Sequence, residues 1–120
     1  MMSTQQIAKR LAELMSQGKF EDAQKELFAD DAVSIEPQQS EAFAKETKGL
    51  PAIIEKGHKF QSMIEKRHSC STSEPLVAGN GIAIALTMDA TMKGRGRTQL
   101  KEICVYEVKD GKVRSEQFFM

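Results

Sequence analysis

Glu36 is the residue of this chain whose type and position point most directly to chemistry. It ends a short alternating run, Ala32-Val33-Ser34-Ile35-Glu36, and Pro37 follows it. A carboxylate that faces an apolar cavity loses hydration, which raises its pKa toward neutrality and allows it to take a proton from carbon. A Glu36 that merely ends a strand in solvent is the alternative, and the sequence leaves both interpretations open.

Proton transfer of this kind also needs a hydrogen-bond donor beside the oxygen that gains negative charge. Tyr106 and Gln117 are neutral donors on faces that the sequence pattern directs inward. Gln61 falls within an apolar helical stripe beside Gly57, where a glutamine needs a partner and the glycine leaves room for a ligand. His58 lies at the margin of that stripe, so it is either a half-exposed flanking residue or part of a cavity wall. The predicted ligand-binding residues are Gln61, His58, Glu102, Cys104, Tyr106 and Gln117.

The composition argues against polyanionic partners. Lysine plus arginine number 17 and aspartate plus glutamate number 17, so no overall field steers the chain toward nucleic acid or an anionic membrane. Basic residues do gather around one turn, where they could contact a phosphate group. No aromatic residue interleaves with them, so a solvated hairpin tip is the better explanation. The basic residues are Lys93, Arg95, Arg97 and Lys101. No metal or cofactor is predicted, because His58, His68 and Cys70 have no metal-ligand spacing.

The chain has two cysteines, Cys70 and Cys104, both within strand-like runs. It shows neither a charged-then-apolar leader nor an apolar run long enough to cross a bilayer. We therefore expect a reduced, cytoplasmic protein with free thiols, which is the commoner state of buried cysteines in the cytosol. A bridge between the two cysteines stays open as the alternative.

Three helices in the first half of the chain are predicted to position these side chains. Ser3 followed by Gln6 is a capping-box pattern, and the helix that it starts ends at Gly18. A shorter helix spans Phe20–Phe28, and a third spans Leu50–Ile64 with a proline in its first turn.

The connection Gln38–Lys48 is polar, and Phe43 is its only large apolar side chain. A surface loop that tucks Phe43 onto the core is the simpler interpretation. A functional lid over a site is the alternative, because a loop of this length in a small domain often covers one.

Four long antiparallel strands are predicted after the helices. They span Arg67–Ala78, Ile82–Met92, Thr98–Val108 and Lys112–Phe119, with turns at Gly79-Asn80-Gly81, Gly94–Arg97 and Asp110-Gly111. Alternation places His68, Cys70 and Thr72 on one face of the first strand. In the second strand, the apolar face toward the helices consists of Ile82, Ile84, Leu86, Met88 and Met92. The opposite face is flat and mixed in character, which suits a homodimer interface.

The strands and helices together predict one α+β domain over residues 1–120. Their order, with Phe-Ala-Asp-Asp-Ala before Glu36, Gly-Leu-Pro-Ala-Ile-Ile opening the third helix and Asp-Gly-Lys-Val before the last strand, resembles the nuclear transport factor 2-like superfamily. The SnoaL-like and ketosteroid-isomerase-like members are the most similar in pattern. The resemblance implies a cone-shaped cystatin-like roll, in which three N-terminal helices pack on a curved, mainly antiparallel sheet around a pocket. It also implies homodimers formed through the outer sheet face.

The resemblance assigns roles to individual residues. In ketosteroid isomerases the general base is the acidic residue before the proline, which here is Glu36. Their oxyanion hole uses a tyrosine on the first helix and a protonated aspartate on the penultimate strand, and these positions fall near Leu11 and at Cys104. Leucine donates no hydrogen bond and a thiol donates weakly, which argues against steroid-type isomerisation. Cyclase-like members need an acid and base pair, which Glu36 with Glu102 or His68 would supply.

Three hypotheses follow. The first is a protein that binds a small hydrophobic molecule with a polar end in an apolar pocket. The second is an acid-base isomerase, cyclase or dehydratase that acts on a hydrophobic carbonyl compound with Glu36 as the base. The third is a non-catalytic dimerisation domain. In the first two, Glu102 and Tyr106 would belong to the site. The alternative is that Glu36 is the solvated end of a strand and that Glu102 and Tyr106 form an ordinary buried polar pair.

Overall fold

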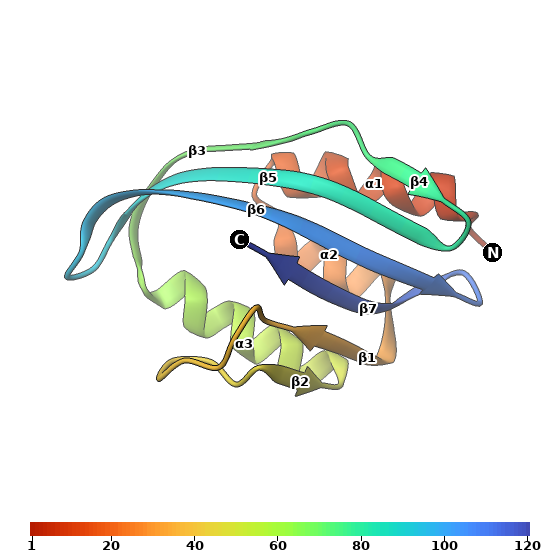
Figure 1. The fold of residues 1–120 in the computed structure, drawn as a ribbon, viewed down its shortest axis with the longest axis horizontal. Helices are drawn as coiled ribbons and strands as arrows, with labels where there is room; N and C mark the ends of the chain where they lie inside the picture. Colours follow the sequence, from red (N-terminus) through yellow and green to blue (C-terminus); the bar gives the residue numbers. More distant parts are fainter.

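Three helices cover one face of a curved seven-stranded sheet (Figure 1). The computed structural model describes all residues, 1–120. The helices are α1 (Thr4–Ser16), α2 (Phe20–Leu27) and α3 (Leu50–Ser62). The strands are β1 (Phe28–Ile35), β2 (Glu46–Lys48), β3 (Ile64–Thr72), β4 (Leu76–Ala78), β5 (Gly81–Met92), β6 (Gly96–Lys109) and β7 (Lys112–Phe119). The predicted α+β architecture is confirmed. With 13, 8 and 13 residues, the helices are too short to traverse a bilayer.

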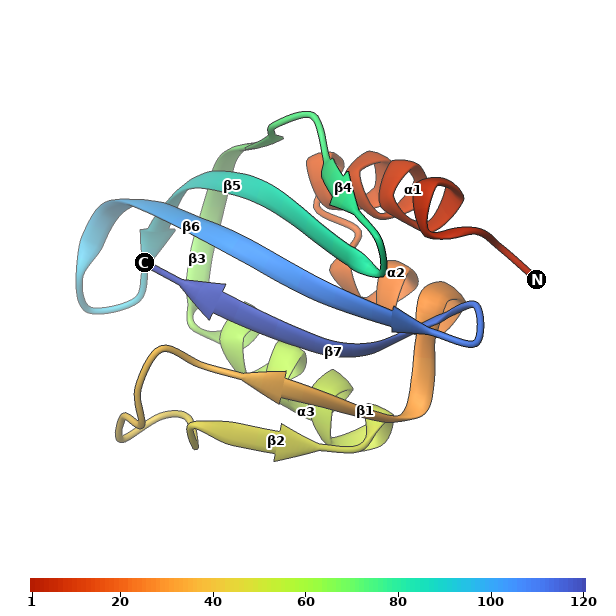
Figure 2. The same cartoon turned by 45° about the vertical axis from the view of Figure 1, so that its right-hand side comes forward.

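The sheet brings the first and last strands of the chain together. Its strand order is β2-β1-β7-β6-β5-β3, and β4 pairs with β5. Neighbouring strands are antiparallel except β1 and β7, which run parallel. Helix α3 lies behind β1 and β7, while α1 lies beside β4 (Figure 2). Side chains from β1, β7 and α3 can therefore meet.

Helix α1 begins where the sequence predicts. Ser3 and Gln6 form a reciprocal capping box, in which the Ser3 hydroxyl oxygen accepts from the Gln6 N–H over 3.1 Å and the Gln6 side-chain oxygen accepts from the Ser3 N–H over 2.8 Å. Ile7, Leu11 and Met15 recur at every fourth position and are buried. This apolar face anchors α1 on the sheet.

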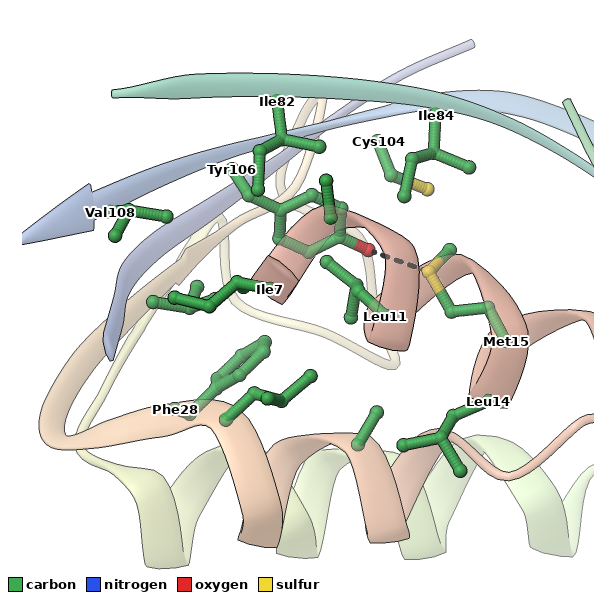
Figure 3. Close-up of a cluster of buried hydrophobic side chains, with 14 of the residues drawn as sticks. Ile7, Leu11, Leu14, Met15, Phe28, Ile82, Ile84, Cys104, Tyr106 and Val108 are labelled. Carbon is green, nitrogen blue, oxygen red and sulfur yellow. Dashed lines mark hydrogen bonds between the residues drawn. The ribbon is translucent and has the colours of Figure 1, made fainter. Parts of the chain in front are cut away.

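The main hydrophobic core lies between α1, α2 and the inner face of β5 and β6 (Figure 3). The Tyr106 ring meets the Phe28 ring edge-on with 6.4 Å between centroids, and the Tyr106 hydroxyl donates to the Met15 sulfur over 3.4 Å. The predicted alternation of β5 is confirmed, because Ile82, Ile84, Leu86, Met88 and Met92 are all buried. Tyr106 is thus a core residue.

Several element boundaries differ from the prediction. Helix α3 ends at Ser62 rather than Ile64, because Ile64 already pairs with Met92 in the sheet. The predicted strand Arg67–Ala78 is divided into β3 and β4, and Pro75, which has no N–H to donate, lies in the break. The end of the connection Gln38–Lys48 forms β2, which pairs with β1.

The rest of that connection packs on α3. Phe43 is half-buried, and the Lys59 ammonium lies 5.4 Å from the centre of its ring. Lys59 also donates to the Ala42 carbonyl. The loop therefore lies on the surface of α3, but Phe43 contacts Lys59 and not the hydrophobic core onto which the sequence interpretation placed it.

A bulge at His68 overturns the prediction that His68, Cys70 and Thr72 share one face. Here β3 has one residue more than β5 opposite it. The alternation therefore changes, and Cys70 points inward together with Arg67. His68 is exposed, and its Nε2 lies 2.7 Å from the Thr91 hydroxyl oxygen.

Arg67 joins the end of α1 to the end of α3. Its guanidinium donates to the Gly18 carbonyl over 3.2 Å and to the Gln61 side-chain oxygen over 2.7 Å, and it lies 5.7 Å from the Phe20 ring centre. Gly18 has a φ of +74°, and a β-carbon on it would lie 2.0 Å from Nη1 of Arg67. The backbone conformation therefore favours glycine here, and a β-carbon would also require the Arg67 side chain to move.

Gly18→Ala should destabilise the fold by about 2 kcal/mol, because it strains a left-handed backbone and displaces Arg67. Gly94→Ala is the matched control: Gly94 has a φ of +77° with open space around it, so only the backbone strain of about 1 kcal/mol applies. Urea unfolding followed by circular dichroism measures both losses. Equal losses would mean that Arg67 does not restrict Gly18.

Candidate functional site

Five polar side chains meet on the inner face of the sheet opposite α3. Ser34 lies on β1, Glu36 directly after it, Lys56 on α3, Glu102 on β6 and Glu116 on β7. We call these five residues the inner polar cluster. Ser34 and Glu116 are 0% and 4% exposed, whereas the Lys56 and Glu36 side chains are 14% and 21% exposed. The cluster therefore extends from the molecular interior to a partly open edge.

A continuous hydrogen-bonded path links four of the five side chains. The Lys56 ammonium donates to Glu36 Oε2 over 2.8 Å and to the Ser34 hydroxyl oxygen over 2.6 Å. The Ser34 hydroxyl in turn donates to Glu116 Oε1 over 2.8 Å. The Lys56 ammonium also lies 5.5 Å from the centre of the Phe118 ring. The path thus connects the partly exposed Glu36 to the buried Glu116.

Strand register accounts for this arrangement. The parallel pairing of β1 with β7 places Ser34 beside Glu116, and the antiparallel pairing of β6 with β7 places Glu116 opposite Tyr106. Residues paired in this way share a face of the sheet. Lys56 follows the buried Ile53 by three residues and so lies on the side of α3 that faces the sheet.

Burial and like charge raise the pKa values of two carboxyls in the cluster. The pKa of Glu116 rises to about 7, chiefly because the carboxyl is buried. Ser34 and Lys56 lower this pKa, and the charges of Glu36 and Glu102 raise it. Burial, and then the charge of Glu36, raises the pKa of Glu102. The cluster can therefore gain or lose a proton near neutral pH.

Four predicted site residues lie in the cluster or beside it: Glu36, Glu102, Cys104 and Tyr106. The Cys104 thiol lies 3.7 Å from Glu102 Oε1, and burial raises its pKa, so it remains a neutral, weak donor. Burial raises the pKa of Tyr106 far above its usual range. Because its hydroxyl is directed at Met15, Tyr106 does not donate into the cluster.

Gln61 and His58 do not reach the cluster. Gln61 is exposed near the end of α3, where its side-chain oxygen accepts from Arg67. The His58 side chain is 55% exposed and forms ion pairs with Glu21 and Glu55, and the hydrogen bond to Glu21 raises its pKa. The predicted position of Gln61 fails because the buried face of α3 is centred on Ile53, and the last turn of this helix meets solvent.

Gln117 lies on the outer face of the sheet, contrary to its predicted inward direction. Strand β7 carries one extra residue at Arg114, opposite the step from Glu107 to Val108 in β6. This bulge reverses the alternation beyond it. Glu116 therefore faces inward, whereas an uninterrupted alternation along β7 would turn Gln117 inward instead.

The sequence interpretation missed Ser34, Lys56 and Glu116. Ser34 has a usable signal, because a strand that turns Glu36 inward also turns Ser34 inward. Lys56 follows Ile53 by three residues, so helical periodicity could have placed it on the same face of the third helix. Glu116 had none, because its direction depends on the bulge at Arg114.

Two hollows of the surface lie away from the cluster. One, of about 510 Å³, runs between α1 and the connection from β3 to β4. The other, of about 540 Å³, lies between the start of the chain and the turn from β6 to β7. No group of three or more histidine, cysteine, aspartate and glutamate side chains is arranged to hold a metal ion. Cys70 and Cys104 are both free thiols, as expected.

Comparison with known proteins identifies the family. A model of the SnoaL-like domain matches residues 2–120. A solved structure from Mesorhizobium loti, provisionally named a SnoaL-like polyketide cyclase with "carbohydrate phosphatase" in brackets, is 32% identical and has a TM-score of 0.91. The match covers 99% of this chain and 100% of that one. No curated protein matches.

More distant structures share the fold. A nuclear transport factor 2-like protein of unknown function from Burkholderia pseudomallei is 14% identical, has a TM-score of 0.78, and is matched over 99% of this chain and 92% of its own. A protein with a ketosteroid-isomerase-like fold from Catenulispora acidiphila, solved with trimethylamine, is 19% identical, has a TM-score of 0.69, and is matched over 98% and 87%. The predicted superfamily and its cystatin-like roll are confirmed. Since the family model spans nearly the whole sequence, this chain belongs to the SnoaL-like domain family.

Proposed function

We propose that this protein binds a small molecule with an apolar body and a polar end, and that the inner polar cluster holds the polar end. The observation that carries the proposal is the path from Glu36 through Lys56 and Ser34 to Glu116. Burying charged groups is unfavourable even when they are paired. Such a cluster inside a small domain is therefore explained better by a ligand than by stability.

The surroundings of the cluster suit an apolar ligand body. The backbone of α3 approaches β1, β2 and β3 more closely than the central strands β6 and β7, so only side chains cross the interval beneath those strands. Partly buried apolar side chains lie nearby: Phe118 packs beside Lys56 and against the main core, and Phe60, Met63 and Leu100 pack against buried residues of β5. Side chains of this kind can move aside for a ligand without breaking backbone hydrogen bonds.

Relatives support a role in binding. The Catenulispora acidiphila protein, of similar fold, was solved with trimethylamine, so a small molecule accompanies this fold at least once. The Mesorhizobium loti relative carries the provisional name of a polyketide cyclase, and polyketides are largely apolar molecules with carbonyl groups. That name fits a ligand that is part apolar and part polar.

Fluorescence titration with 2-acetylnaphthalene, a bicyclic ring with a ketone end, should saturate at one molecule per chain. Lys56→Met should weaken this binding about tenfold, because it removes the charged donor of the cluster. Lys66→Met, at an exposed lysine of β3, is the control and should leave the affinity unchanged. A titration that never saturates, or equal affinities in all three proteins, would contradict the proposal.

The second candidate function is acid-base catalysis on a hydrophobic carbonyl compound, by an isomerase, cyclase or dehydratase. Glu36 favours it, because it lies at the open edge of the cluster with Oε2 bound to Lys56 and Oε1 without a protein partner. In such a reaction Oε1 takes the proton from the carbon beside the carbonyl. The electron pair of that C–H bond moves toward the carbonyl oxygen, and Glu36 later returns a proton.

Catalysis of this kind should exchange the methyl hydrogens of 2-acetylnaphthalene for deuterium in D₂O buffer. Glu36→Gln should slow the exchange by at least about 100-fold while the far-ultraviolet circular dichroism spectrum stays the same. Glu65→Gln, at an exposed glutamate, is the matched control. Proton NMR follows the exchange, and an equal rate in wild type and Glu36→Gln would exclude this role for Glu36.

We also propose that two chains associate through the outer face of the sheet. Ile103 of β6 and Phe119 of β7 lie opposite each other and are 50% and 49% exposed. Adjacent apolar side chains on a sheet surface are a common feature of protein interfaces.

Sedimentation velocity should therefore detect a dimer that Ile103→Lys converts to a monomer, because the substitution puts a charge into the interface. Met2→Lys, at an exposed apolar residue outside the sheet, is the control. A wild-type protein that stays monomeric at all concentrations would overturn the proposal.

We also propose that the protein is located in the cytoplasm. The support for this location is the pair of unlinked thiols, of which Cys104 is wholly buried and Cys70 partly buried. Recovery of the protein in the secreted fraction of fractionated cells would contradict this location.

A further inference from the structure

Glu116 is a buried carboxyl to which no cation is bound directly. It is 4% exposed, and its one hydrogen bond in the protein is the one that Oε1 accepts from the Ser34 hydroxyl. The Lys56 ammonium makes its contacts with Ser34 and Glu36 instead. A buried carboxylate without a directly bound cation is unfavourable, so the geometry favours the neutral acid.

The path also fixes which oxygen of the acid carries the proton. An ammonium group can only donate, so the Ser34 oxygen accepts from Lys56 and the Ser34 hydrogen is free to be donated elsewhere. That hydrogen goes to Glu116 Oε1, which is therefore an acceptor. The proton of the neutral acid must then reside on Oε2. Oε2 has no hydrogen-bond partner in the protein and keeps some contact with solvent, since Arg67 Nε is the only fully buried side-chain polar atom without a partner.

The groups that face Glu116 from the other elements do not provide that partner. From β6, Tyr106 donates to Met15 and Cys104 donates to Glu102. The charges of Glu102 and of Glu36, which follows β1, both raise the pKa of Glu116, and with burial they bring it to about 7. Lys56 and Ser34 oppose this shift without abolishing it. An acceptor brought by a ligand would complete the arrangement.

We propose that Glu116 is the neutral hydrogen-bond donor of this site, and that its Oε2–H binds an acceptor oxygen, such as a ketone, at the polar end of the ligand. The inference rests on the proposed binding function and narrows it to ligands whose polar end accepts hydrogen bonds. A protonated amine is disfavoured at Oε2, because both groups would donate. Glu116 touches the ligand directly and is a binding residue.

The affinity of the site for a hydrogen-bond acceptor should depend on pH. Only the protonated acid donates, so the affinity for an acceptor falls as the pH rises through the pKa of Glu116. With a pKa of about 7, the protonated fraction drops about tenfold between about pH 6 and about pH 8, and the affinity should drop by the same factor. A ligand without a polar end should show no such change.

Three probes with the same ring system test the proposal: 2-acetylnaphthalene, naphthalene and 2-(aminomethyl)naphthalene. Fluorescence titrations across this pH range should show a tenfold loss of affinity for the ketone, no change for naphthalene and weaker binding of the ammonium probe. Glu116→Gln should bind the ketone with an affinity that no longer depends on pH, because the amide N–H donates at every pH. Glu65→Gln should keep the wild-type dependence.

A second measurement on the wild-type protein does not require a ligand. Carbon-13 NMR of protein labelled at the glutamate side-chain carboxyls should give one signal that titrates with a midpoint of about 7 and is missing in Glu116→Gln. If no probe binds but this midpoint is found, the proposed binding function fails while the protonation of Glu116 stands. A Glu116 midpoint near the ordinary glutamate value, or ketone binding that is independent of pH, or preferred binding of the ammonium probe, would each overturn the proposal.

Discussion

A single ammonium group, that of Lys56, ties α3 to the inner face of the sheet where the helix and the central strands are set apart. It binds the carboxylate of Glu36 and the hydroxyl of Ser34, and both acceptors lie at the end of β1. Because an ammonium can only donate, this contact also orients the Ser34 hydroxyl toward Glu116. The direction of every hydrogen bond in the path therefore follows from one residue of α3.

Two irregularities in strand pairing decide which side chains of β7 and β3 face inward. The bulge at Arg114 turns Glu116 and Phe118 inward on β7, and the bulge at His68 turns Cys70 inward on β3. A shift of one residue exchanges the two faces of a strand for the rest of its length. The inner polar cluster thus depends on the count of residues in β7 as much as on their types.

The same reasoning explains how far the sequence could predict the molecule. The capping box of α1 and the alternation of β5 are local patterns, and the structure follows both of them. Gln117 could not be placed, because nothing near Arg114 in the sequence signals an extra residue. The bond from Ser34 to Glu116 joins residues 82 positions apart, and only the parallel pairing of β1 with β7 creates it.

Tyr106 and Glu116 lie opposite each other on neighbouring strands, yet they belong to different environments. The Tyr106 ring contacts Phe28 and its hydroxyl Met15 within the apolar core, whereas Glu116 belongs to the polar cluster. Burial of the apolar side chains around Tyr106 offsets the loss of folding stability caused by burying the Glu116 carboxyl, since hydrophobic burial is the dominant favourable contribution to folding. Proteins commonly keep such a destabilising group where binding or chemistry requires it. The boundary between Tyr106 and Glu116 therefore separates the part of the inner face that holds the fold together from the part that is available for function.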